Sequence, residues 1–116
     1  MAANTMGIAR IAQSCVQSTS DAGFDLIAKV RDGQRAIDVA IMGSGKRLYV
    51  IRCVGRSSPE DHAALETMVL QGPFLWGGLV YRDGGPSTDR TGVESFHETE
   101  LHQLIARLQE LQETLQ

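Results

Sequence analysis

The apolar residues along the chain change their spacing several times, and each change predicts a new element. Between about residues 5 and 19, apolar side chains recur at the spacing of one helix face. These side chains are Ile8, Ile11, Ala12, Cys15 and Val16. Asn4 or Thr5 can cap this helix, because either side chain offers an oxygen to the first free amides.

The pattern then falls to a period of two, which predicts three strands. Phe24 to Val30 alternates as a half-buried strand does, and Asp32-Gly33 predicts a hairpin turn because its tight bend needs positive φ. The second strand, Ala36 to Ile41, has apolar side chains at every other position. The third, Leu48 to Val54, is apolar on both faces, which is typical of a central strand that is covered on both sides.

A second helix and a fourth strand follow. Ser58 is a good N-cap, Pro59 suits the first helical position, and Gly72-Pro73 ends the helix. Phe74 to Tyr81 predicts the strand, in which Gly77-Gly78 marks a bulge or a close backbone approach.

The last part of the chain predicts one short strand and one long helix. Val93 to Phe96 is the strand, and the helix covers roughly residues 97–115, with Ser95 and Glu98 as a capping box at its start. The order of elements is therefore α-β-β-β-α-β-β-α. We expect an α+β fold in one domain, residues 1–116, with helices packed on a mixed sheet of about five strands.

Composition agrees with a folded chain and narrows the choice of partners. Hydrophobic residues make up 42% of the 116 residues and charged residues 22%, so disorder is not expected. The formal net charge is −3, whereas a protein that binds nucleic acid usually carries a basic surplus. The charge therefore argues against nucleic acid as a partner.

The sequence also predicts the compartment. No apolar run approaches the roughly 20 residues that span a bilayer. The N-terminal residues do not have the basic segment and apolar run of a signal peptide. Cys15 and Cys53 lie in apolar stretches, where a thiol behaves as a small hydrophobe, and two such residues make no disulfide framework. We expect a cytoplasmic protein that does not contact a membrane.

Two motifs resemble known ligand sites but depart from them in spacing. His97, Glu98 and His102 give H-E-x-x-x-H, and residues five positions apart are rotated by roughly 140° on a helix, too far to hold one zinc ion. Gly43-Ser44-Gly45-Lys46 resembles the end of a phosphate-binding loop, but a strand follows it where that loop needs a helix. We expect neither a metal nor another cofactor at these residues.

The order helix, three strands, helix, strand, with an aspartate on the second strand, resembles the core of the restriction-endonuclease-like PD-(D/E)xK superfamily. In that superfamily an aspartate and a second carboxylate on the next strand hold Mg²⁺, and a lysine two residues further on helps to activate water. The resemblance assigns Asp38 to the aspartate. The chain then departs from the pattern, because Arg52 stands in the place of the second acid and Val54 in that of the lysine.

This resemblance leaves a nuclease-like protein, or its inactive relative, as an alternative. In an active form, Glu60 or Glu66 on the second helix would have to replace the missing acid, and Lys46 the missing lysine. Mg²⁺ would then be the cofactor.

The C-terminal helix carries a different hypothesis. Its leucines fall at the a and d positions of a heptad, and such a seam packs against another helix. They are Leu101, Leu104, Leu108, Leu111 and Leu115. The alternative is that this face covers the domain's own sheet. A helix of ~19 residues is about 28 Å long, so its last turn can extend beyond the domain.

The size, acidic balance and order of elements are also similar to those of the small dimeric chaperones of type III secretion, a resemblance of architecture only. No complete catalytic set is present. The leading hypothesis is therefore a non-catalytic protein-interaction domain that self-associates as a homodimer, or binds a helix of a partner, through Leu104, Leu108, Leu111 and Leu115. The alternative is the nuclease-like protein centred on Asp38.

Overall fold

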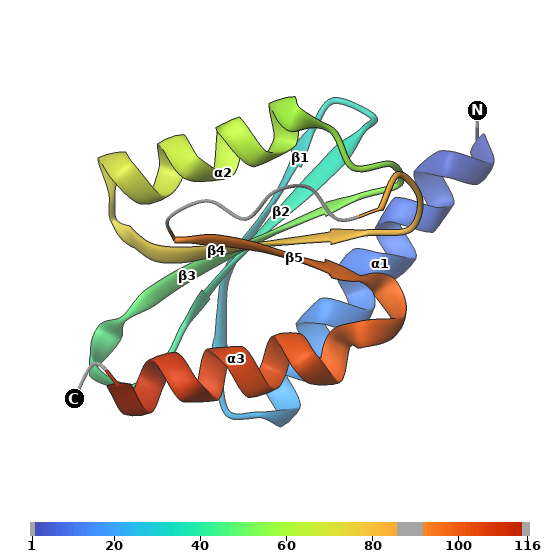
Figure 1. Ribbon diagram of the computed structural model, residues 1–116. Helices are drawn as coiled ribbons and strands as arrows, with labels where there is room; N and C mark the ends of the chain where they lie inside the picture. Colours follow the sequence, from blue (N-terminus) through green and yellow to red (C-terminus); the bar gives the residue numbers. More distant parts are fainter. Residues whose placement is uncertain (1, 86–91, 115–116) are drawn as a thin grey trace.

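The computed structural model of the chain describes residues 2–85 and 92–114. Within these residues, five strands form one mixed sheet and three α-helices cover it (Figure 1). The elements follow the order α-β-β-β-α-β-β-α. The α+β fold and the element order expected from the sequence are therefore confirmed.

The strands follow one another across the sheet in chain order. They are β1 (Asp25–Asp32), β2 (Ala36–Met42), β3 (Leu48–Val54), β4 (Phe74–Tyr81) and β5 (Val93–His97). The first three form an antiparallel meander, whereas β4 runs parallel to β3, and β5 parallel to β4. The sheet is mixed because a helix connects β3 to β4, and a parallel pair needs such a crossover.

The helices lie on both faces of the sheet (Figure 1). The crossover helix α2 (Pro59–Gln71) covers one face, and α1 (Ala2–Asp21) and α3 (Leu101–Thr114) cover the other. Short 3-10 turns at Ser44–Lys46 and Glu98–Glu100 precede β3 and α3.

The two faces of β3 pack into two cores. The larger core lies between the sheet and the helices α1 and α3, and it includes Tyr49, Ile51 and Cys53. The smaller core lies under α2 and includes Val50 and Val54. The expectation of a central strand that is apolar on both faces is borne out.

The glycine pair of β4 permits close packing on both faces. A Cβ atom added to Gly77 would lie 3.1 Å from Leu65 of α2. One added to Gly78 would lie 2.9 Å from the Trp76 ring and 3.1 Å from Leu104 of α3. The close backbone approach predicted for this pair is confirmed.

The first helix and the first strand differ from expectation. Because α1 begins at Ala2, Asn4 and Thr5 lie inside the helix, and the prediction that one of them caps it is wrong. The half-buried alternation predicted for β1 is also wrong. This strand is an edge strand with a bulge between Leu26 and Ala28, and nearly all of its side chains are exposed.

The cap before α3 lies two residues later than expected. The Nδ1 atom of His97 accepts a hydrogen bond from the amide of Thr99 at 3.2 Å. Glu100 accepts the amide hydrogen of His97 at 2.8 Å. The capping box therefore consists of His97 and Glu100. The sequence did not predict it because histidine is not among the residues that usually occupy an N-cap position.

None of the helices in the described parts of the chain combines the length and the apolar character that crossing a bilayer requires.

Candidate functional site

Asp38 and Arg52 lie opposite each other on the antiparallel strands β2 and β3. Both point to the sheet face that carries α2, because Val50 and Val54 on either side of Arg52 pack in the core beneath that helix. Arg52 is the one charged residue of β3, and its side chain is only 5% exposed. A guanidinium group at such a position needs carboxylate partners.

Every nitrogen of the Arg52 guanidinium group donates to a carboxylate. Nε donates to Asp61 at 3.0 Å, and Nη2 donates to Asp32 at 2.6 Å. Nη1 donates to both oxygens of Asp38, at 3.1 and 2.9 Å. The Asp61 side chain is 1% exposed, that of Asp38 14%, and that of Asp32 61%. We call these four residues the Arg52 cluster.

The first turn of α2 supplies the most deeply buried acid of the cluster. Ser58 caps this helix by accepting the amide hydrogen of Asp61 at 3.3 Å, and its hydroxyl donates to the Asp61 carboxylate at 2.7 Å. Arg35, in the turn between β1 and β2, donates to Ser58 at 3.0 Å and to Asp61 at 3.3 Å. Asp61 therefore joins two arginines, one buried and one at the surface.

The cluster shifts the pKa values of its two strand aspartates in opposite directions. Burial raises the pKa of Asp38, and the charges of Asp32 and Asp61 add to this against the lowering effect of Arg52. The hydrogen bond and the charge of Arg52 lower the pKa of Asp32. Burial lowers the pKa of Arg52, but its carboxylate partners raise it by more, so the guanidinium group stays charged.

Of the acids considered from the sequence, Asp38 belongs to the Arg52 cluster. Glu60 lies outside the cluster but pairs with Arg35, which binds Asp61 of the cluster. Glu60 pairs with Arg35 at 3.1 Å, and its side chain is 81% exposed. Asp61 binds both Arg35 and the buried Arg52, and it therefore lies between the two guanidinium groups.

The other two candidates lie elsewhere. Lys46 is in the turn that follows β2, and the four steps along the strand from Asp38 to Met42 alone span about 13 Å. Glu66 is five residues beyond Asp61 on α2, and it is therefore rotated from Asp61 by roughly 140°. Among residues 2–85 and 92–114, no three His, Cys, Asp or Glu side chains are arranged to hold a metal ion.

Asp32, Asp61 and Arg35 are site residues that sequence reasoning missed. The signal that points to them is Arg52, since a buried arginine in an apolar strand requires acids nearby. The sequence does not say which acids these are. Asp32 lies 20 residues before Arg52 and Asp61 lies 9 after it, and only the fold brings them together.

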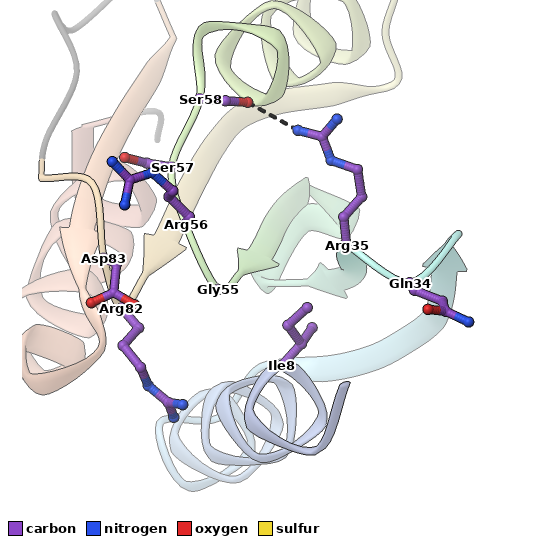
Figure 2. A pocket seen from close by; sticks show the side chains of 9 residues that line it. All are labelled: Ile8, Gln34, Arg35, Gly55, Arg56, Ser57, Ser58, Arg82 and Asp83. Carbon is purple, nitrogen blue, oxygen red and sulfur yellow. Dashed lines mark hydrogen bonds between the residues drawn. The ribbon is translucent and has the colours of Figure 1, made fainter. Parts of the chain in front are cut away.

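A cleft of about 520 Å³ adjoins the cluster at the end of the sheet where β3 and β4 end and β2 begins. Arg35 and Ser58 belong to both the cleft and the network around Asp61. Figure 2 shows Ile8 rising from α1 toward Gly55, with arginine side chains on different sides of this centre. The cleft is lined by Ile8, Gln34, Arg35, Gly55, Arg56, Ser57, Ser58, Arg82 and Asp83. We call it the arginine cleft.

Backbone hydrogen bonds hold the two strand ends of the cleft together. The amides of Arg82 and Asp83 donate to the carbonyl of Gly55 at 3.1 and 2.8 Å. The amide of Ser57 donates to the carbonyl of Asp83 at 2.9 Å. The segments that follow β3 and β4 therefore form one fixed wall of the cleft.

The leucines of α3 pack largely on the chain's own sheet. Leu104 and Leu108 are fully buried in the larger core, and Leu111 is partly buried against it. Leu115 lies outside the described residues. A partner helix cannot reach Leu104 or Leu108 while α3 stays on the sheet, so the face covers the sheet at these two positions.

The cysteines and His62 belong to the interior. Cys53 and Cys15 are fully buried, with their Sγ atoms 3.7 Å apart, and hydrogen bonding to Cys15 together with burial raises the pKa of the Cys53 thiol. A raised thiol pKa disfavours the nucleophilic thiolate. His62, in the first turn of α2, is 1% exposed.

Comparison with family models, with curated proteins and with solved structures found no match to this chain.

Proposed function

We propose that this chain is a non-catalytic binding domain whose ligand site is the arginine cleft. The observation that carries the non-catalytic part of the proposal is the position of the Arg52 guanidinium group, which donates hydrogen bonds to Asp32, Asp38 and Asp61. A metal-dependent nuclease needs a divalent cation among its carboxylates, where it stabilises charge on the phosphate and activates water. Here a fixed positive charge uses the carboxylate oxygens that such a cation would need.

Replacement of this guanidinium group by a metal ion is unfavourable. Arg52 would have to leave a buried position and break four hydrogen bonds. Removal of one partner from a buried ion pair typically costs about 3–5 kcal/mol. Arg35, on the other side of Asp61, would also repel the incoming cation. These contacts favour the inactive form of a nuclease-like protein over the active form.

The binding part of the proposal rests on the place and size of the cleft. Open sheets with parallel strands commonly bind ligands in a crevice beyond the carboxyl ends of those strands. The arginine cleft lies at the carboxyl ends of β3 and β4, between α1 on one face and the start of α2 on the other. Its volume of about 520 Å³ is within the usual range of small-molecule sites.

Self-association through the leucine seam is not part of this proposal. Leu104 and Leu108 are fully buried within the chain, and they are two of the four residues on which that hypothesis rested. Their burial already stabilises the chain by covering its own sheet, so a second copy has little of the seam to contact.

Two measurements test the proposal. Purified protein is incubated with single-stranded DNA, double-stranded DNA and RNA in the presence of Mg²⁺ or Mn²⁺, and we expect no cleavage. A panel of small anions, cations and neutral sugars is then titrated into ¹⁵N-labelled protein. We expect one class of probe to shift the amide signals of Gly55, Arg56 and Ser57 in a saturable way.

Different outcomes would contradict the two parts of the proposal. Metal-dependent cleavage that the Asp38→Asn variant abolishes would contradict the non-catalytic part, and the variant controls for a contaminating nuclease. A panel that leaves the cleft amides unchanged would contradict the binding part.

A further inference from the structure

The arginine cleft combines three positive charges with one negative charge. Arg35, Arg56 and Arg82 line it together with Asp83. The three arginines come from three separate segments, namely the β1–β2 turn, the loop after β3 and the loop after β4. The lining therefore has a positive balance in a chain whose formal net charge is −3.

The three arginines differ in the contacts that their side chains already make within the chain. Arg35 pairs with two carboxylates of α2, and Arg82 donates to both oxygens of Glu98 at 2.9 and 3.0 Å. Arg56 is exposed and has no hydrogen bond or ion pair of its side chain within the described parts of the chain. Arg56 is thus the arginine of the cleft that a ligand can bind without breaking a contact to any described side chain.

The positive end of α2 contributes little to this balance. Glu60 and Asp61 already lie in the first turn of the helix, and the Ser58 hydroxyl accepts one of the free amide hydrogens. Acidic side chains at this position compensate the helix dipole. The attraction for an anion therefore comes from the arginine side chains.

We propose that the arginine cleft binds the phosphate group of a small molecule. This inference rests on the proposed function, because it names the ligand of the same cleft. The planar guanidinium fork matches two phosphate oxygens at once, and such charge-assisted pairs are about twice as strong as neutral hydrogen bonds. Arg56 supplies a fork that no described side chain occupies. Arg35 and Arg82 line two further sides, where Glu60, Asp61 and Glu98 already offset part of their charge.

The other lining residues limit the rest of the ligand. Ile8 offers an apolar contact, Gln34 can donate and accept hydrogen bonds, and Asp83 can accept one from a hydroxyl or amino group. Asp83 and the negative net charge also oppose a long polyanion, because each additional phosphate adds repulsion. Phosphate itself and small organic phosphates meet these conditions.

The test titrates inorganic phosphate, ribose 5-phosphate and ribose into the ¹⁵N-labelled full chain at constant ionic strength. We expect both phosphate probes to shift the amide signals of Gly55, Arg56 and Ser57, and ribose to shift none of them. Tighter binding of ribose 5-phosphate identifies an ester as the ligand, whereas equal binding identifies phosphate itself. Both results support the inference.

Two matched variants connect the binding to Arg56. Arg56→Gln should weaken the binding of the phosphate probes by about tenfold, since one charge-assisted pair is lost. Arg31→Gln removes an exposed arginine on β1 that does not line the cleft, and binding should change by less than about twofold because Arg31 offers the ligand no donor and solvent screens its charge. The thermal midpoint of Arg56→Gln should equal that of the wild type, so weakened binding does not report unfolding.

Absence of phosphate-induced shifts would overturn the inference, and so would shifts of equal size and midpoint in Arg56→Gln. If a neutral or cationic probe shifts the same amides and phosphate does not, the phosphate inference fails while the proposed binding domain stands. Metal-dependent cleavage of nucleic acid contradicts the proposed function, whatever the result of the phosphate titration.

Discussion

Asp38 and Arg52 are direct cross-strand partners, and Nη1 of Arg52 donates to both carboxylate oxygens of Asp38, at 3.1 and 2.9 Å. Side chains that lie opposite each other on antiparallel strands are close enough for their charges to determine whether the pair stabilises the sheet. Two acids at these positions would repel each other and would need a cation between them. With arginine at position 52 the pair is neutral by itself, and the same guanidinium group also satisfies Asp32 and Asp61.

Arg52→Met should destabilise the chain strongly, because it leaves Asp38 and Asp61 without their buried partner. We expect the free energy of unfolding, measured by urea denaturation at neutral pH, to fall by about 3–5 kcal/mol. Arg35→Met is the matched control, since the Arg35 side chain is 54% exposed, and its loss should be within about 1 kcal/mol. Equal losses in the two variants would contradict the central role of Arg52.

Asp38 and Asp32 should titrate on opposite sides of the usual aspartate pKa. Because the pKa of Asp38 is raised in the folded chain, its contribution favours folding at low pH and is lost as the pH rises through the raised value. The pKa of Asp32 is lowered, so its contribution is present above the usual value and is lost as the pH falls through the lowered one.

Titration of the carboxyl carbons by NMR checks this order. In Arg52→Met the pKa of Asp32 should return toward its usual value, and that of Asp38 should rise further, because Arg52 lowers both. An Asp38 pKa below that of Asp32 in the wild type would contradict the arrangement.

Local signals predicted the centre of the fold well. The bounds of β3 and β4 agree with the expected ranges, since each strand is a continuous apolar run between turn residues. The helix between them begins after Ser58 and ends before Gly72, where the capping residues stand. At these elements the propensity, the hydrophobic pattern and the caps all indicate the same structure.

Features that depend on contacts between residues far apart in the sequence were harder to predict. The apolar residues Leu26 and Ile27 of β1 are about half exposed. Their own pattern could not predict this exposure, because it does not tell whether a helix covers an edge strand. The leucine seam has the same spacing whether it covers a sheet or meets another helix, so Leu104 and Leu108 fit both interpretations in the sequence. The Arg52 cluster was missed because its acids come from three different elements.

Gly78→Ala should destabilise the chain by about 1–3 kcal/mol, because the new Cβ would meet the Trp76 ring at 2.9 Å and Leu104 at 3.1 Å. Gly55→Ala is the matched control: its Cβ would have its nearest neighbour, Ile8, at an ordinary 3.9 Å. That variant should be neutral, or more stable by about 0.4–1 kcal/mol through the entropy of the unfolded chain. Thermal denaturation of both proteins measures the difference, and a tolerated Gly78→Ala would contradict the close approach of α3 to β4.

Leu108→Ala should lower the free energy of unfolding by about 2–5 kcal/mol, because the side chain is fully buried in the larger core. Leu111→Ala should have a smaller effect, since Leu111 is only partly buried against that core. Urea denaturation gives the two values, and light scattering gives the molar mass of each variant. If α3 serves its own sheet, the molar mass stays constant across the wild type and both variants. A molar mass that halves in Leu111→Ala would instead show that a second copy packs on α3 at Leu111, which the larger core buries only in part. That result would support the hypothesis of self-association.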